Sequence, residues 1–308
     1  MWKSVIDSAE KIKHLEIQGA RNVAIAAIKS VEAGVKESKA KTKQTFLKEL
    51  SEAQTVLFSS RSTEPLMRNA VLYVVQAVET SPKTEVSELV ETVSQVSAQF
   101  LRQLERSKEQ IAAVGSKRIS DGSMVLTHCH SSTVMNILKK AKADGKRFEV
   151  VCTESRPVFQ GRLTAKELLD AGIKTTMIVD SAVRHFINEV DFVVVGADAI
   201  TSEGNVVNKI GTSMVALAAS EARTPFYVAT ELLKFDPITV LGAYEPIEER
   251  NPKEVWDTTP LGLIIRNPAF DVTRRDFIHG LICEEGIIAP YAVSELMHRK
   301  YPWMFETT

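Results

Sequence analysis

Beyond Gly122, short apolar runs alternate with helical segments, and this alternation constrains the fold more than any other feature of the chain. The runs are SMVLTHC, FEVVCTE, TTMIVD, DFVVVGAD and PFYVAT. Such runs are typical of strands that are buried on both faces of a parallel sheet. Helical segments such as STVMNILKKAKADG and TSMVALAASEA lie between them. The pattern predicts a doubly wound, mostly parallel, Rossmann-like α/β domain over residues 116–308.

Residues 1–115 have a different pattern of apolar residues, which recur there at helical spacing without strand-like alternation. The longest stripe repeats every three or four residues: Val86, Leu89, Val93, Val96, Phe100 and Leu104. Spacing of this kind predicts amphipathic helices. A helical N-terminal domain followed by an α/β domain also suits a chain of 308 residues, since domains average roughly 150 residues.

Charge and cysteine usage exclude several classes of protein. The 38 Lys and Arg residues are balanced by 39 Asp and Glu, which argues against a basic nucleic-acid binder. No apolar run reaches the roughly 18 residues of a membrane span, and charges interrupt the N-terminus where a signal peptide would be apolar. The three cysteines lack CxxC spacing. We therefore expect a cytoplasmic protein with reduced thiols, no disulfide framework and no zinc site.

Polar residues gather where the predicted strands end, which is where parallel sheets bind ligands. Helix capping accounts for the hydroxyl-bearing ones: Ser131, Ser132, Thr164 and Ser181. It does not account for a second group, whose side chains are reactive or cationic: Cys129, Arg156, Arg184 and Lys209. This second group therefore marks the candidate site.

Cys129 and Asp198 are the candidates for acid and base chemistry. A cysteine beside a helix N-terminus tends toward the thiolate form, although a buried structural cysteine is the alternative. Asp198 follows the apolar run VVVGA, where loss of water would favour its proton-bearing form and general acid catalysis. Its alternative roles are a turn cap or an ion pair.

The segment NKIGT places Asn208 and Lys209 before a helix that opens near Gly211. A lysine beside free helix N–H groups would form a phosphate pocket. Neither a GxxxxGK[ST] loop nor a GxGxxG loop occurs, which disfavours a nucleoside triphosphatase or a dinucleotide enzyme. His128 and His130 flank Cys129, but alternate strand positions rarely close a metal site, so we expect no metal.

Three strings together, THCHSS, TESRPVFQGR and GADAITSEGNVVNKIGT, resemble one superfamily. It joins the alpha, beta and delta regulatory subunits of the exchange factor for eukaryotic initiation factor two with the sugar-1-phosphate isomerases. The resemblance extends from LEIQGARNVA (residues 15–24) to EEGIIAPYAV near the C-terminus. It implies a helical domain followed by a Rossmann-like domain.

The isomerase branches carry a catalytic cysteine after a strand and a catalytic aspartate in a GAD motif. Cys129 in THCHS and Asp198 in GADAI match both. The motifs ESRPVFQG, DSAVRH, NKIGT and NPAFDVT resemble the ribose-1,5-bisphosphate isomerases most closely. The resemblance implies that Cys129 is the base and Asp198 the acid in an aldose–ketose isomerisation that needs neither metal nor redox cofactor.

The resemblance also implies a set of substrate-binding residues: Gly19, Ala20, Arg21, Arg61, Arg156, Arg184, Asn208, Lys209 and Lys234. One departure concerns the N-terminal phosphate-contacting segment. Relatives tend to read RGA there, whereas this chain has Gln18 before Gly19 and Ala20, with Arg21 following.

The resemblance implies a sugar bisphosphate substrate, activation by AMP, and a homo-oligomer built as dimers or a hexamer, with no nucleic acid or membrane partner. Two alternatives remain open. One is a non-enzymatic regulatory subunit, which the retained pair of Cys129 and Asp198 disfavours. The other is a methylthioribose-1-phosphate isomerase, which would lack a second phosphate site.

Overall fold

The computed structural model describes residues 1–61 and 63–305. They form two compact units. The first contains residues 1–61, 63–105, 233–235 and 301–305, and the second contains residues 106–232 and 236–300. Helix α5 (Val86–Ser116) runs through both units. The sequence predicts the domain boundary at residue 115, where apolar residues stop recurring at helical spacing. In the structure the boundary falls earlier, within α5, because Ile111 near the end of this helix belongs to the core of the second unit.

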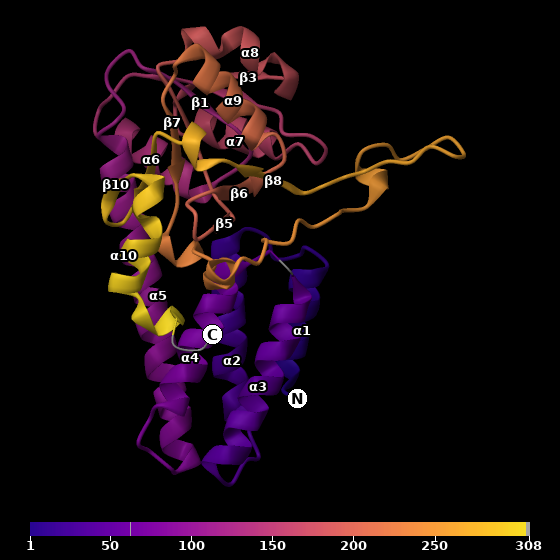
Figure 1. The fold of residues 1–308 in the computed structure, drawn as a ribbon, viewed down its shortest axis with the longest axis vertical. Coiled ribbons are helices and arrows are strands. Elements are labelled where there is room, and N and C mark those ends of the chain that lie inside the picture. Colours follow the sequence, from indigo (N-terminus) through magenta and orange to yellow (C-terminus); the bar gives the residue numbers. More distant parts are fainter. Residues whose placement is uncertain (62, 306–308) are drawn as a thin grey trace. The chain divides into compact units, whose positions relative to one another are not determined.

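The first unit is helical, as the apolar spacing predicts (Figure 1). Its helices are α1 (Lys3–Lys13), α2 (Ala20–Gly34), α3 (Lys43–Ser60), α4 (Pro65–Glu79) and the first part of α5. Helix α3 begins with a capping box between Thr42 and Thr45, and α4 begins with Pro65 in its first turn, where proline is tolerated. On α5, Leu89, Phe100 and Leu104 are buried.

The second unit is built on a seven-stranded sheet in the order β10-β9-β7-β4-β1-β2-β3. The strands are β1 (Met124–Thr127), β2 (Glu149–Thr153), β3 (Lys174–Ile178), β4 (Phe192–Val195), β7 (Phe226–Ala229), β9 (Gly280–Cys283) and β10 (Gly286–Ile288). All neighbouring pairs are parallel except β9 and β10. Four of the five apolar runs contain one of these strands, and the fifth, TTMIVD, overlaps β3 from its second residue on, which confirms the predicted fold class.

Five helices accompany the sheets: α6 (Ser132–Ala143), α7 (Gln160–Asp170), α8 (Val183–Phe186), α9 (Thr212–Ala222) and α10 (Val293–Lys300). Val125, Val150 and Val194 share one face of the sheet and pack with Ile137 and Leu138 of α6 in a single core. Their strand neighbours face the opposite side, because side chains alternate along a strand.

Strand β3 departs from the prediction that all five runs are buried on both faces. It lies at the end of the strand order, so one edge has no neighbouring strand. Met177 is 47% exposed and Val179, just after the strand, is 53% exposed. The apolar composition of TTMIVD does not reveal this, because the position of a strand in the sheet is set by the whole topology.

A second, antiparallel sheet contains β5 (Ala199–Ile200), β6 (Val206–Lys209) and β8 (Phe270–Thr273) in the order β5-β6-β8. Its register pairs Asn208 with Asp271 and Lys209 with Phe270. This sheet is not predicted from the sequence, since the three strands are short and β8 follows β6 by some sixty residues. It places Asn208 and Lys209 on a strand instead of in a loop.

Candidate active site

Cys129 lies just beyond the carboxyl end of β1, and Asp198 follows β4, the strand beside it. Because β1 and β4 are parallel, their carboxyl ends meet at the same edge of the sheet. The two side chains are near enough for the negative charge of Asp198 to act on the thiol. Both are half-buried. The structure thus brings the predicted pair together.

The backbone of Cys129 is left-handed, with a φ of 67°. Its N–H donates to Ser155 Oγ at 2.8 Å, and its carbonyl accepts from Thr164 Oγ1 at 2.9 Å. Ser155 follows β2, and Thr164 lies inside α7. Two neighbouring elements therefore hold both polar groups of this residue.

The predicted helix caps have different outcomes. Ser131 caps α6 by accepting from the Val134 N–H, as predicted. Thr164 is not a cap, because α7 already begins at Gln160 and the hydroxyl of Thr164 contacts Cys129 instead. Ser132 is the first residue of α6, and Ser181 lies within a 3-10 turn.

His128 is buried beneath the Cys129 loop. Its Nε2 lies 2.9 Å from the Ile210 carbonyl, which can only accept, so Nε2 carries the proton. Its Nδ1 lies 2.6 Å from Thr153 Oγ1 and accepts from that hydroxyl. Burial lowers the pKa of His128, while the bond to Ile210 and the charge of Asp180 act in the opposite direction. A neutral His128 therefore links the end of β1 to the end of β2 and to the residue after β6.

Asp180 organises the loop after β2, a role that was not predicted. Its carboxylate accepts from the N–H groups of Ser155 at 2.8 Å and Arg156 at 2.7 Å. Asp180 follows β3 in sequence, so its position at a strand end was the only available signal.

The thiol of Cys129 is protonated in the free protein. Burial raises its pKa to about 11, while the Lys209 ammonium and the His130 N–H lower it and the charges of Asp198 and Asp180 raise it. The predicted thiolate is therefore wrong for this state. A helix terminus contributes only ~0.3–1 kcal/mol at most exposed sites, which desolvation outweighs here.

Lys209 is the cation that acts on Cys129. It is buried at the end of β6, and its Nζ lies 5.2 Å from the centre of the Phe270 ring. Its neighbour Asn208 is also buried, and Asn208 Nδ2 donates to Thr212 Oγ1 at 3.0 Å. The structure thus places Lys209 at the predicted site, held by a strand that was not predicted.

The predicted phosphate pocket at the start of α9 is wrong, because a carboxylate already fills it. Asp271 on β8 accepts from the N–H groups of Gly211 at 2.8 Å and Ser213 at 3.1 Å. Burial raises the pKa of Asp271 to about 6, although these two bonds lower it. The register of β6 and β8 brings Asp271 there, so local sequence around NKIGT could not reveal it.

Replacing this carboxyl is expected to change how stability depends on pH. The pKa of Asp271 is about 6 in the folded chain and ~3.9 when unfolded. The folded state therefore binds more protons between these values, and wild type loses stability as pH rises through them. Relative to Asp271→Asn, we expect a loss of roughly 1–3 kcal/mol from about pH 4 to 6.5. Urea unfolding of wild type and Asp271→Asn at each pH measures the difference in the free energy of unfolding. If that difference did not change with pH, the raised pKa of Asp271 would be contradicted.

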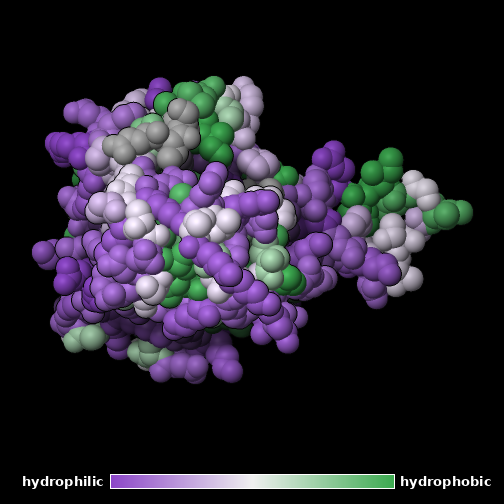
Figure 2. Space-filling view, turned by 90° about the horizontal axis from the view of Figure 1, so that it is seen from below, coloured by the Kyte–Doolittle hydropathy of each residue, from purple (hydrophilic) through white to green (hydrophobic). Residues whose placement is uncertain are grey.

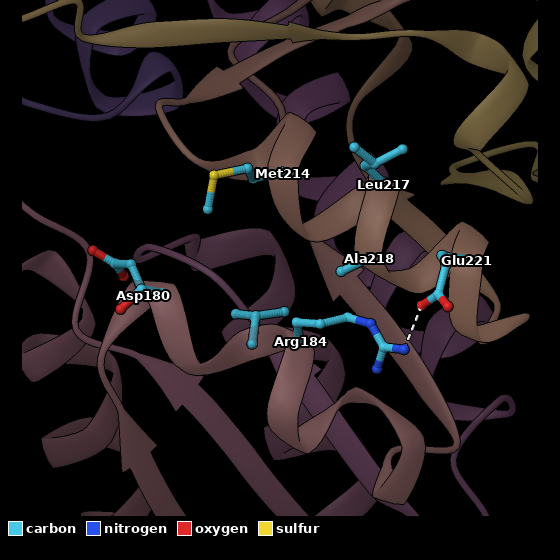
Figure 3. Close-up of a pocket in the computed structure, with 8 residues that line it drawn as sticks. Asp180, Arg184, Met214, Leu217, Ala218 and Glu221 are labelled. Carbon is cyan, nitrogen blue, oxygen red and sulfur yellow. Dashed lines mark ion pairs between the residues drawn. The ribbon is translucent and has the colours of Figure 1, made fainter.

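Arg156 and Arg184 were both predicted to bind substrate. The Arg156 N–H is held by Asp180, and its exposed guanidinium donates to the Val255 carbonyl at 2.9 Å. Arg184 lines a pocket of about 280 Å³ and pairs with Glu221 at 2.7 Å. Figure 3 shows its guanidinium pointing toward Glu221, with Asp180 at the opposite end of the pocket. Such an exposed pair is worth only ~0–1 kcal/mol, so a phosphate could displace it.

The remaining predicted residues lie in the first unit. Gly19 precedes α2 with a φ of 83°, and Ala20 and Arg21 begin that helix. Arg21 pairs with Glu105 at 2.6 Å, and Arg61 pairs with Glu64 at 2.8 Å. Lys234 is buried in a 3-10 turn, Leu232–Lys234. Their roles in substrate binding stay predictions.

Within residues 1–61 and 63–305, no three His, Cys, Asp or Glu side chains lie close enough together to hold a metal ion. No helix in the same ranges combines the length and apolarity of a membrane span.

Comparisons with known proteins place the site in a wider context. Residues 16–290 match the model of the Initiation factor 2 subunit family. The chain is 46% identical over 290 residues to the ribose 1,5-bisphosphate isomerase of Archaeoglobus fulgidus. The aligned residues cover 94% of this chain and 90% of that protein.

Two crystal structures from Pyrococcus horikoshii OT3 share the fold. The translation initiation factor eIF-2B superposes with a TM-score of 0.81 at 30% identity, over 94% of this chain and 98% of the other. The 5-methylthioribose 1-phosphate isomerase superposes with a TM-score of 0.79 at 28% identity, over 99% of this chain and 88% of the other.

Proposed function

Because the chain belongs to the Initiation factor 2 subunit family, we propose that it converts ribose 1,5-bisphosphate to ribulose 1,5-bisphosphate. It is an enzyme of the aldose–ketose isomerase type, as its relatives are. The observation that carries the proposal is the placement of Cys129 and Asp198 after neighbouring parallel strands, with Lys209 of the second sheet near enough for its charge to act on the thiol.

The reaction needs an acid and a base, since the phosphate on the anomeric carbon prevents spontaneous ring opening. In our proposal Asp198 protonates the ring oxygen as its bond to C1 breaks, and Cys129 takes the proton from C2. An enol phosphate results. Return of a proton to C1 and loss of the C2 hydroxyl proton then give the ketose. General acid–base steps of this kind typically contribute 10²–10⁴-fold each.

The working pair holds one proton, which lies on Asp198 when Cys129 is the thiolate. The form with a thiol and a carboxylate holds the same number, so the working fraction does not change with pH while one proton is shared. We expect kcat/KM to stay flat through neutral pH and to fall only near the Cys129 pKa of about 11. A pH–rate profile from about pH 6.5 to 11 tests this. A tenfold rise per pH unit near the ordinary thiol pKa of ~8.5 would contradict it.

Anion-binding groups support a phosphorylated substrate. Lys209 stands beside the thiol, and the N-terminal turn of α6 begins three residues after Cys129. Helix N-termini attract phosphates.

A side-by-side assay distinguishes the candidate functions. Purified chain is offered ribose 1,5-bisphosphate and methylthioribose 1-phosphate, and ketose formation is followed for each. We expect turnover of the bisphosphate. Preference for the methylthio sugar would favour the methylthioribose-1-phosphate isomerase alternative. The Pyrococcus horikoshii enzyme of that name has a fold similar to that of this chain. If neither sugar phosphate were turned over, the proposed isomerase activity would be overturned and the regulatory subunit would be favoured. AMP, added to the same assay, tests the expected activation.

We also propose that the chain assembles with copies of itself in the cytoplasm. An arm of residues 242–266 extends from the second unit (Figure 1) and carries apolar side chains at its tip (Figure 2). Within residues 242–266, Leu261 and Ile264 are 107% and 85% exposed, and exposed apolar patches mark interaction surfaces. All three cysteines are unpaired, which suits a reducing compartment.

Light scattering should give a multimeric mass for the wild type and a smaller mass for Leu261→Asp. A monomeric wild type would overturn the proposed assembly.

A further inference from the structure

We propose that the hydroxyls of Ser155 and Thr164 hold Cys129 in its left-handed backbone conformation and thereby aim its thiol at the substrate. They act as positioning residues. The inference rests on the proposed isomerase function. A series of hydrogen bonds starts at Cys129, runs through buried side chains and ends at Ile210, the residue after Lys209.

The conformation of Cys129 requires support from its surroundings. Its φ of 67° is left-handed, which costs a residue other than glycine about 1–2 kcal/mol. A cysteine without external partners would relax to an ordinary conformation. Its Cβ would then point elsewhere, and its thiol would move with it.

Two side chains supply that support at the two ends of the residue. Ser155 Oγ accepts the Cys129 N–H at 2.8 Å, and Thr164 Oγ1 donates to the Cys129 carbonyl at 2.9 Å. Both side chains are buried, so water does not readily replace either hydroxyl as a hydrogen-bond partner of Cys129. His130 Nδ1 lies 2.9 Å from Thr164 Oγ1 and donates to it, since the threonine proton is already used on Cys129.

The bonds beyond Ser155 have only one consistent direction. Ser155 Oγ accepts from Cys129, so its own proton is available for Thr153 Oγ1 at 3.2 Å. Thr153 in turn donates to His128 Nδ1 at 2.6 Å, and His128 Nε2 donates to the Ile210 carbonyl at 2.9 Å. A backbone N–H at one end and a backbone carbonyl at the other determine every proton between them.

The chain of bonds ends beside Lys209, so it also sets the position of the cation relative to the thiol. Ile210 directly follows Lys209. Gly211 comes next with a φ of 100°, and a Cβ there would lie 3.1 Å from the His128 ring. The close approach of this loop to His128 therefore depends on glycine.

A second glycine lets Thr164 reach Cys129. Gly161 lies in the first turn of α7, and a Cβ there would lie 1.8 Å from the Thr153 carbonyl oxygen. Only glycine allows α7 to start against the end of β2. Thr164 stands one turn further along the same helix and thereby faces the Cys129 loop.

The test removes each hydroxyl and measures turnover and thiol reactivity together. Thr164→Val keeps the side-chain shape, and Ser155→Ala removes the other bond. We expect kcat to fall by roughly 10- to 100-fold with KM changed less than about threefold, the scale expected when a reacting group is misplaced. Thr164→Ser retains the hydroxyl and should keep most of the activity. Thr224→Val is the matched control, because it removes a hydroxyl that donates only to the Ile187 carbonyl.

Alkylation by iodoacetamide near pH 8 gives a readout that does not need turnover. A released Cys129 should become more exposed than in its half-buried wild-type position, so its thiol should react faster in the variants although catalysis is slower. Cys152 and Cys283 are buried and should stay unreacted if the unit is intact. Mass spectrometry identifies the modified residue.

The outcomes separate this inference from the proposed function. An inactive wild type whose Cys129 alkylation still accelerates in both variants would overturn the isomerase but keep the positioning role. Unchanged kcat and unchanged alkylation in Thr164→Val and Ser155→Ala would overturn the positioning role. Alkylation of all three cysteines would do the same, because it would show general loosening instead of loss of one constraint.

Discussion

Cys129→Ser is expected to lose turnover by at least ~10²-fold while binding substrate nearly as well as wild type. The serine hydroxyl is similar in size but is a far weaker acid than a thiol, so the oxyanion needed to take the C2 proton does not form. Lys209, which lowers the pKa of the thiol, cannot compensate for this difference. Steady-state rates and calorimetric binding of the bisphosphate measure the two quantities separately.

Cys152→Ser is the matched control for this substitution. Cys152 is fully buried in β2, and burial raises its pKa to about 11, as for Cys129. We expect its variant to keep the rate and to lose stability, since a buried hydroxyl without a partner costs about 1–3 kcal/mol. Near-normal turnover in Cys129→Ser would remove Cys129 from the mechanism, whatever Cys152→Ser does.

Asp198→Asn is expected to keep the fold and to lose at least ~10²-fold in rate, the usual scale for removing a general acid. The amide has nearly the same shape, so packing is preserved. The Asp198 N–H still donates to the Val207 carbonyl at 2.9 Å, which keeps the loop in place. The amide cannot deliver a proton to the ring oxygen. Rates and thermal unfolding of the variant provide the measurement.

A substrate complex of Asp198→Asn adds a structural test of the same role. We expect a closed, unreacted ring whose oxygen faces residue 198. An open-chain sugar in that complex would contradict the assignment, because ring opening would then occur without Asp198. Survival of activity would instead indicate that Asp198 only caps the turn between β4 and β5.

The sequence predicted the parts of the site that depend on local pattern and known motifs. Apolar runs located β1 and β4, and the strand-end rule then pointed to Cys129 and Asp198. The family match confirms the superfamily resemblance, while the acid and base roles that it implies for these two residues stay predictions. Lys209 was found as well, although its strand was not.

The sequence misjudged the chemistry of the thiol and of the anion pocket. A helix start after Cys129 suggested a thiolate, yet burial raises the pKa to about 11. Free N–H groups after Lys209 suggested a phosphate pocket, yet Asp271 fills it from β8. Both errors concern neighbours that are distant in sequence and close in space.

By itself the sequence determined the fold class, the order of the strands along the chain and the candidate pair of Cys129 and Asp198, because periodicity and strand ends are local properties. Only the tertiary structure decided that β3 lies at the edge, that Asp271 caps α9 and that Ser155 and Thr164 hold Cys129. The physical reason is that hydrogen-bond partners and burial arise from packing between segments far apart in the chain. Such contacts leave no periodic trace, so a threonine that is predicted to cap a helix can instead hold the backbone of Cys129.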